Sequence, residues 1–265
     1  MLTVSRALRE GAYSFCRNRS SHKTPPLNEQ PFGILGWLKL AYRVANLDRH
    51  PNVGPAYAVD LRGRGNSDGE RFYVEDFEDY VSDVEAVVKM AKSRDSSLPF
   101  FLLGHSAGGV VSCLYRLDHQ PELAGLTCES FSHELPAPDF ALAVFKGLAH
   151  VAPHAHILHL PNERFSRDPK VVEAMNEDPL IAHETQPTRT MAALVRADVR
   201  LKREVPLITL PVLILHGSDD KNTKPSGSQH FYDMVGSADK TLKLYEGGCD
   251  VTRGSHHSMS RPFSK

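Results

Sequence analysis

Residues 100–113 read Phe-Phe-Leu-Leu-Gly-His-Ser-Ala-Gly-Gly-Val-Val-Ser-Cys. The first residues form an apolar run between Pro99 and a Gly-x-Ser-x-Gly turn, which predicts a short strand buried on both faces. A helix is expected after the turn, because apolar residues recur at helical steps in Val110, Val111, Leu114 and Leu117. This stretch therefore predicts a strand, a sharp turn centred on Ser106, and a helix.

The turn has the pattern of a nucleophile elbow, Gly104-His105-Ser106-Ala107-Gly108. A strand that enters a helix in this way holds the central residue in strained backbone geometry, which is tolerated when its neighbours lack side chains. The hydroxyl of Ser106 then stands at the carboxyl edge of the sheet, beside the free N–H of Ala107 at the helix N-terminus. This pattern favours attack on an ester or amide. A glycine-rich turn with an incidental serine is the alternative.

Composition indicates one domain with a full core, because the chain has 265 residues of which 41% are hydrophobic. A formal net charge of -1 gives no electrostatic reason to expect a nucleic acid partner. The four cysteines have no metal-type spacing, so reduced, packed thiols are expected at Cys16, Cys113, Cys128 and Cys249.

Targeting signals are sparse. No stretch approaches the roughly 18 apolar residues of a membrane span, and the N-terminus lacks the apolar segment of a secretory signal. We therefore expect a soluble, cytoplasmic protein without an integral membrane segment. The excess of Lys and Arg over acidic residues in residues 1–55 makes an organellar transit peptide the alternative.

The rest of the chain alternates strands with helices. Strands are expected at residues 56–60, 123–128, 210–215 and 241–245, with a helix at 226–235. Another helix should follow the glycine-rich turn at 61–69. Its acidic face is expected to be solvated: Glu75, Asp76, Glu78, Asp79 and Asp83. This alternation predicts a mostly parallel central sheet flanked by helices.

Residues 131–205, here called the cap, have a helical and irregular pattern, with helices expected at 141–149 and 170–175. An insertion on the carboxyl side of the sheet would lie over Ser106. Its apolar residues would either line an acyl channel or pack the cap on the core: Phe140, Leu142, Val144, Phe145 and Leu148. Four histidines are expected to lie on a polar cap surface, and a metal site is the less favoured alternative: His150, His154, His156 and His159.

A second site residue follows the strand at 210–215. Asp220 comes just past this buried strand, so it should lie at the same sheet edge as Ser106. The order of nucleophile and then acid along the chain supports a catalytic carboxylate. Asp219 is its rival in the same turn, and a simple Asx-type turn is the alternative to catalysis.

Three segments together resemble one family: Asp-Leu-Arg-Gly-Arg-Gly-Asn-Ser-Asp-Gly (60–69), Leu-Gly-His-Ser-Ala-Gly-Gly (103–109) and Pro-Val-Leu-Ile-Leu-His-Gly-Ser-Asp-Asp (211–220). They resemble the α/β-hydrolase fold, in its monoacylglycerol lipase and lysophospholipase-like branch, over about residues 56–247. The resemblance implies a cap, no cofactor, no metal, and a serine hydrolase of carboxylic esters such as monoacylglycerols or lysophospholipids. It implies Ser106 as nucleophile, Asp220 as the residue that orients the base, and the Ala107 amide as half of the oxyanion hole.

The ends of the chain depart from the family pattern. The family spacing places the catalytic histidine at position 250, where this chain has Asp250. His256 and His257 follow and are the candidate bases, in a tail that is rich in Ser, Arg and Gly. Without a base, the hydroxyl of Ser106 would remain a poor nucleophile.

On the N-terminal side, residues 1–55 show no early apolar strand with a His-Gly loop, which supplies the other oxyanion donor in the family. Residues 32–41 instead suggest a short amphipathic helix. Loss of that strand would interrupt the sheet between the strand at 56–60 and the strand before Ser106. A disturbance of the reading frame at both ends and genuine divergence are the two explanations.

The expected organisation is an atypical segment at 1–55, an α/β-hydrolase core at 56–130 and 206–247, the cap between them, and an atypical tail at 248–265. The expected partner is a small ester or lipid, with transient contact between the cap and a lipid surface. One alternative function is a catalytically impaired remnant or binding protein without the base. The other is an aminopeptidase-like hydrolase of the same fold.

Overall fold

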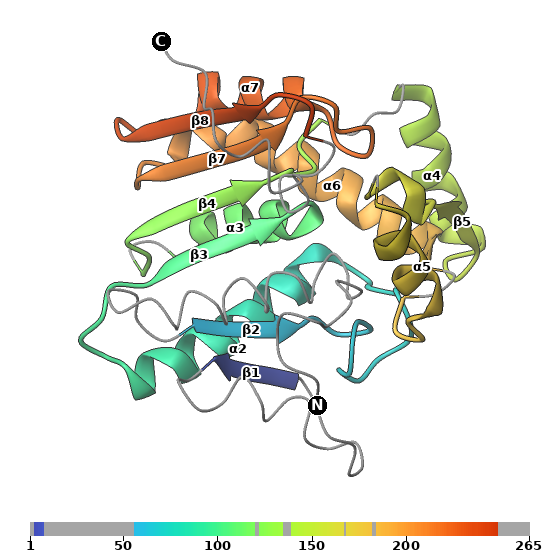
Figure 1. Ribbon diagram of the computed structural model, residues 1–265, viewed down its shortest axis with the longest axis horizontal. Helices are drawn as coiled ribbons and strands as arrows, with labels where there is room; N and C mark the ends of the chain where they lie inside the picture. Colours follow the sequence, from blue (N-terminus) through green and yellow to red (C-terminus); the bar gives the residue numbers. More distant parts are fainter. Residues whose placement is uncertain are drawn as a thin grey trace.

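The computed structural model describes residues 3–7, 56–119, 122–134, 139–166, 168–181 and 184–248. Its main sheet has four strands in the order β3-β4-β7-β8, and every neighbouring pair is parallel. The bounds are β3 Phe101–His105, β4 Gly125–Glu129, β7 Val212–Gly217 and β8 Lys240–Tyr245. The predicted α/β class and parallel sheet are confirmed (Figure 1).

The expected strand at 56–60 is present as β2 (Ala56–Asp60), but it is outside the main sheet. It pairs antiparallel with β1 (Thr3–Ala7) in a separate two-stranded ribbon. Among the described residues, no strand joins β2 to β3, which agrees with the interruption expected from the missing family strand. β1 was not predicted, because its sequence Thr-Val-Ser-Arg-Ala has no apolar run, and it is not the apolar strand with a His-Gly loop that the family pattern calls for.

Exposure along β3 corrects one expectation. Phe101 is 68% exposed, whereas Gly104 and His105 at the other end of the strand are buried. The strand is thus buried at its carboxyl end and open at its start. The sequence pattern could not show this, because β3 is the edge strand of the four-stranded sheet.

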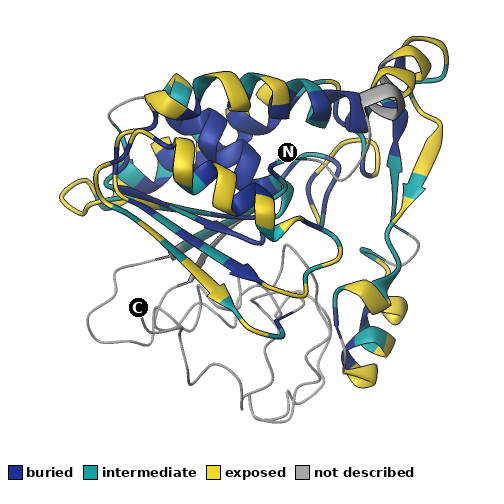
Figure 2. Cartoon of the chain, turned by 90° about the horizontal axis from the view of Figure 1, so that it is seen from above, coloured by how far each residue is buried: buried dark blue, intermediate teal, exposed yellow. Residues whose placement is uncertain are grey.

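Three helices pack together beside the sheet: α2 (Phe77–Arg94), α3 (Ala107–Asp118) and α6 (Thr188–Glu204). Figure 2 shows their buried faces turned toward the strands. A fourth helix, α7 (Pro225–Met234), contacts β7 and β8. The helix predicted after the turn at 61–69 is confirmed as α2, and the helix predicted at 226–235 is confirmed as α7.

The start of α2 explains its stability and corrects the prediction for its acidic face. The Asp76 side chain accepts hydrogen bonds from the Phe77 and Asp79 N–H groups, and the Asp79 side chain accepts one from the Asp76 N–H; the reciprocal Asp76–Asp79 bonds form a capping box. Asp83 is not solvated: it is 1% exposed and binds the guanidinium of Arg62 at 2.7 Å. The turn at 61–69 curves back so that Arg62 reaches α2, a contact that helical periodicity cannot reveal.

The cap contains α4 (Asp139–Val151), β5 (His156–His159), a short 3-10 turn at Asn162–Arg164, α5 (Pro169–Glu177) and β6 (Thr185–Pro187). The expected helices at 141–149 and 170–175 are confirmed, whereas the antiparallel β5-β6 ribbon and α6 were not predicted. Figure 1 shows α4, β5 and α5 on the side toward which β3 and β4 point. The side chains of Phe140, Leu142 and Phe145 lie outside the described part.

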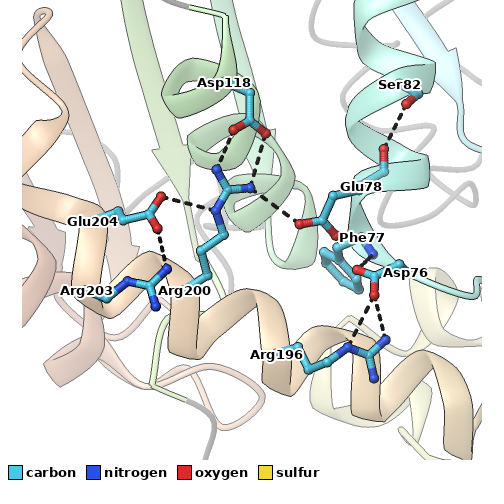
Figure 3. A network of polar contacts seen from close by, with 9 residues as sticks. All are labelled: Asp76, Phe77, Glu78, Ser82, Asp118, Arg196, Arg200, Arg203 and Glu204. Atoms are coloured by element: carbon cyan, nitrogen blue, oxygen red, sulfur yellow. Dashed lines mark hydrogen bonds and ion pairs between the residues drawn. The ribbon is translucent and has the colours of Figure 1, made fainter.

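The last cap element, α6, also packs into the main core. Ala193, Ala197 and Leu201 belong to the buried cluster that contains α3 residues. Arg200 and Arg196 attach the outer side of α6 to neighbouring helices (Figure 3). Arg200 binds Asp118 of α3 and lies 3.4 Å from Glu78 of α2, while Arg196 binds Asp76 at 2.8 Å. A short turn at Val205–Leu207 then returns the chain to β7.

Candidate active site

Ser106 lies between β3 and α3 with φ 53° and ψ -125°. A non-glycine residue at positive φ is strained, and such strain is common at functional sites. Its neighbours hold it there: the Ser106 N–H donates to the Glu129 carbonyl at 3.0 Å, and its carbonyl accepts from Gly109 and Ser132. The predicted sharp turn centred on Ser106 is confirmed.

Gly104 allows this turn because β3 and α3 approach each other closely. A Cβ atom at Gly104 would lie 2.2 Å from the Gly108 carbonyl oxygen and 2.5 Å from the Ser112 hydroxyl. Only a residue without a side chain fits, as the motif predicted. The side chain of Ser106 makes no capping hydrogen bond to α3. It therefore does not occupy the N–H groups at the positive end of this helix, of which Ala107 is the first residue.

The hydroxyl of Ser106 faces a second hydroxyl. Its Oγ lies 3.1 Å from the Oγ of Ser132, which follows β4. Either hydroxyl can be the donor in this contact, and the neutral Ser132 hydroxyl does not act as a base for the Ser106 proton at neutral pH. Ser132 was not predicted as a site residue, because no sequence pattern links the irregular segment after β4 to the turn after β3.

The segment around Ser132 is fixed from the other side. His133 is 2% exposed, stacks on Phe131, and its Nδ1 lies 3.2 Å from Asp198 of α6. Burial raises the pKa of Asp198, but bonds to His133 and Lys202 outweigh this effect, so the pKa lies below its ordinary value. The close contact between the buried His133 ring and the Asp198 carboxylate thus anchors the residue next to Ser132.

His105, the second motif residue, ends β3 and has a buried side chain. Its side chain is buried beside Glu129, its partner in the β3-β4 register, with 4.0 Å between Nδ1 and Oε2. Glu129 is 3% exposed, so the side chains of His105 and Glu129 lie together in a buried position at the carboxyl ends of β3 and β4. Sequence reasoning assigned no role to Glu129, since it ends an otherwise apolar strand.

Asp220 lies in the turn after β7, with its side chain 4% exposed. Its Oδ1 accepts hydrogen bonds from the Asn222 and Thr223 N–H groups, and its Oδ2 accepts one from the Thr223 hydroxyl at 2.7 Å. Burial raises the pKa of Asp220, but the neighbouring His216 and hydrogen bonds from Thr223 and Asn222 lower the pKa by more, so it lies below the ordinary value. The carboxylate forms an Asx-type turn and is ionised at neutral pH.

Asp219, the rival acid, is exposed, and its N–H donates to the Gly248 carbonyl at 2.9 Å. Burial distinguishes the two carboxylates, because the Asp220 side chain is buried whereas Asp219 is exposed. The catalytic role of either stays a prediction.

The chain after β8 is tied to this acid turn. The Ser218 N–H donates to the Tyr245 carbonyl, the Gly247 N–H donates to the Ser218 hydroxyl, and Asp219 binds Gly248. A Cβ atom at Gly217 would lie 2.2 Å from the Gly248 carbonyl oxygen. Residues that follow Gly248 therefore start beside the acid turn. Asp250 and the candidate bases His256 and His257 lie outside the described residues.

The cap histidines make separate contacts. His154 binds Glu70 at 2.9 Å and stacks on Tyr73, while the Nδ1 of His156 lies 2.6 Å from the Thr185 hydroxyl. The Nδ1 of His159 lies 3.1 Å from the Glu184 carbonyl. Among the residues that the structure describes, no three His, Cys, Asp or Glu side chains are grouped to hold a metal ion.

None of the described helices combines the length and apolarity that crossing a membrane requires.

A serine at positive φ between a parallel strand and a helix, with a buried carboxylate after a later strand of the same sheet, defines an α/β-hydrolase with a nucleophile elbow. The sequence matches the hydrolase family described as "Serine aminopeptidase, S33" over residues 55–249. This match covers more than half of the chain, and the chain belongs to that family.

Among known relatives, the chain is 32% identical over 194 residues to a monoacylglycerol lipase of Mycolicibacterium smegmatis, covering 72% of this chain and 69% of that one. It is 33% identical over 198 residues to the monoglyceride lipase of Rattus norvegicus, covering 74% and 65%. The chain thus spans about two thirds of the length of these relatives. The structure of the Paleococcus ferrophilus monoacylglycerol lipase superposes with a TM-score of 0.67 at 25% identity, covering 79% of this chain and 78% of that one. The resemblance to the monoacylglycerol lipase branch is confirmed.

Proposed function

We propose that the protein is a serine hydrolase of carboxylic esters and that its substrates are monoacylglycerol-type or lysophospholipid-type lipids. The observation that carries the proposal is the strained Ser106 at the head of α3. The similarity of the whole chain to proteins named monoacylglycerol and monoglyceride lipases supports the substrate class. No cofactor or metal is needed for this chemistry.

In the proposed mechanism, the Ser106 hydroxyl attacks the ester carbonyl while a histidine removes its proton. The Ala107 N–H stabilises the oxyanion, which collapses to an acyl-enzyme and expels the glycerol oxygen, reprotonated by the histidine. Water, deprotonated by the same histidine, then releases the fatty acid. Asp220 orients the histidine, and its low pKa supports this role because the carboxylate stays ionised.

His256 and His257 are the proposed sources of the base. The backbone bonds between the acid turn and Gly248 support this assignment, because they start the tail next to Asp220. The Ser106–Ser132 contact supports the need for such a base, since a hydroxyl partner cannot accept the proton.

The proposed division into a core, a cap and atypical terminal segments follows the boundaries given above.

The cap is also the proposed contact with a lipid surface. Val151 is 86% exposed and Val144 is 53% exposed on α4, and Leu148 and Ile157 are exposed as well. Exposed apolar side chains on neighbouring elements favour contact with lipid.

The test is intact-mass labelling of the full chain with a fluorophosphonate probe, beside Ser106→Ala. One adduct that is absent from the variant supports an activated Ser106. Hydrolysis of monoacylglycerols of graded chain length, with an amino-terminal peptide amide as comparison substrate, then separates a lipase from an aminopeptidase.

No adduct on wild-type protein with a cooperative unfolding transition would favour the binding or remnant alternative. His256→Ala and His257→Ala, made singly, identify the base: the variant that loses labelling while its neighbour retains it carries the role.

A further inference from the structure

His216 is fully buried at the end of β7, and the proposed mechanism does not use it. Its Nδ1 lies 2.6 Å from the Ser228 hydroxyl of α7, and its Nε2 lies 3.1 Å from the Thr223 hydroxyl. The same Nε2 is 3.5 Å from Oδ2 of Asp220. A buried imidazole therefore stands behind the candidate catalytic acid, connected to it through one hydroxyl.

The directions of these hydrogen bonds follow from the chemistry of each group. An ionised carboxylate only accepts, so the single hydrogen of the Thr223 hydroxyl goes to Asp220, at 2.7 Å. The Thr223 oxygen is then an acceptor for His216, and Nε2 must carry a hydrogen. On the other side of the ring, the buried Ser228 hydroxyl donates to Nδ1, because this leaves the ring uncharged in a site without water contact.

We propose that His216, as the neutral Nε2–H tautomer, is a positioning residue that fixes the Thr223 hydroxyl as a donor to Oδ2 of Asp220. The chain of donors runs from Ser228 to His216, from His216 to Thr223, and from Thr223 to Asp220. This inference extends the proposed function, because it explains how the acid is held ready for the base.

The network also selects which oxygen of Asp220 meets the base. Oδ1 already accepts two backbone N–H groups. Among the described residues, Oδ2 accepts one hydrogen bond, from Thr223, and a carboxylate oxygen has room for two. The second lone pair of Oδ2 is the acceptor site for the N–H of a catalytic histidine. The lowered pKa of Asp220 agrees with this density of donors.

The direct test is nitrogen-15 NMR of the histidine rings in the folded full chain, with the His216 signals assigned by their loss in His216→Gln. We expect a hydrogen on Nε2 and an unprotonated Nδ1 at neutral pH. A hydrogen on Nδ1, alone or together with Nε2, would overturn the proposed direction of the chain.

A matched pair of variants tests the positioning role. Thr223→Val removes the hydroxyl and keeps the shape, whereas Thr223→Ser keeps the hydroxyl. The pKa of Asp220, read from carboxyl carbon-13 shifts, should rise by about one to two units in the valine variant and by much less in the serine variant. Equal values in the two variants would contradict the role.

These readouts do not depend on turnover. Failure of wild-type protein to react with fluorophosphonate would overturn the proposed function and leave the tautomer result standing. The wrong tautomer in a protein that reacts normally would overturn this inference alone.

Discussion

At Gly104 the backbone of β3 passes so close to α3 that a single added carbon meets the Gly108 carbonyl. We expect Gly104→Ala to lower the free energy of unfolding by about 2 kcal/mol or more, because backbone atoms must move. Urea unfolding measures the loss. Gly147→Ala on α4 is the control, since nothing lies within 4 Å of its added Cβ, and it should be neutral or stabilise by about 0.5–1 kcal/mol. Equal effects of the two substitutions would contradict the close approach.

Asp83 and Arg62 make a second prediction at the scale of single residues. Arg62→Met leaves the buried Asp83 carboxylate without its guanidinium partner, which should lower the free energy of unfolding by about 2 kcal/mol. Lys89→Met removes an exposed i,i+4 pair with Glu85 and should change stability by less than about 0.5 kcal/mol. If chemical denaturation gave similar values for both, the burial of Asp83 would not matter energetically.

Asp198 predicts a dependence on pH. Its pKa is lower in the folded chain than the ordinary value of about 3.9, so its stabilising effect is complete above that value and is lost as the pH falls through the folded pKa. The stability difference between wild type and Asp198→Asn should shrink as the pH falls below about 4, because the carboxylate is then protonated in both the folded and the unfolded chain. Denaturant unfolding at several pH values checks this, and a difference that grew on acidification would have the wrong sign.

Some residues of the candidate site could be predicted from the sequence, and others could not. The strained geometry of Ser106 and the position of Asp220 follow from local patterns, because glycines and strand ends are visible in a sequence. Ser132, His133 and His216 were missed as site residues, because their importance comes from contacts with distant segments. The histidines after Gly248 stay predictions.

Among the elements, α6 depends on charged contacts with its neighbours. Arg200 joins it to α2 and α3 (Figure 3). Arg200→Met should lower the melting temperature at low salt, and the loss should be smaller at 1 M salt, where such pairs are screened. Arg203→Met is the control, because Arg203 is 72% exposed and binds only Glu204 of its own helix among the described residues. A loss that did not respond to salt would point to packing of the Arg200 stem instead.

The exposed apolar residues of α4 predict membrane contact by one element. Val151→Asp combined with Val144→Asp should reduce co-sedimentation with neutral phospholipid vesicles severalfold, because both side chains are exposed. Val199→Asp, on α6 and equally 53% exposed, is the matched control for an added charge away from α4. Equal binding by all three proteins would remove the support for a lipid-facing cap.

Elements with strong periodicity or long apolar runs were predicted correctly, namely β2, β3, β4, β7, β8, α2, α3, α4, α5 and α7. The missed strands share a physical reason. The β5-β6 ribbon and β1 are short and polar, so their pairing depends on partners far along the chain. The case of α6 is different: Met191, Val195 and Leu201 form an apolar stripe at helical spacing that the sequence does show, although the charged Asp198 interrupts it.

At the scale of the whole molecule, the described strands β1-β2 pair apart from the described strands β3-β4-β7-β8. Two-stranded ribbons are marginally stable by themselves. We expect β2 amides to exchange with solvent through a partial opening of lower free energy than the global unfolding that exposes β4 and β7. Native-state hydrogen exchange at increasing denaturant measures both, and one common free energy would show that the two parts unfold together.

The interruption between β2 and β3 has a mechanical meaning. Ser106, Ala107 and Asp220 are all carried by the four-stranded part, whereas β1 holds the described amino-terminal residues in the other. Among the described residues, β1 pairs only with β2, and the covalent path from β2 to β3 runs through α2. A load on β1 therefore acts on the antiparallel β1-β2 pairing, which is distinct from the parallel pairing that holds Ser106 and Asp220, so a handle attached at β1 would test the ribbon and not the strands that carry the site.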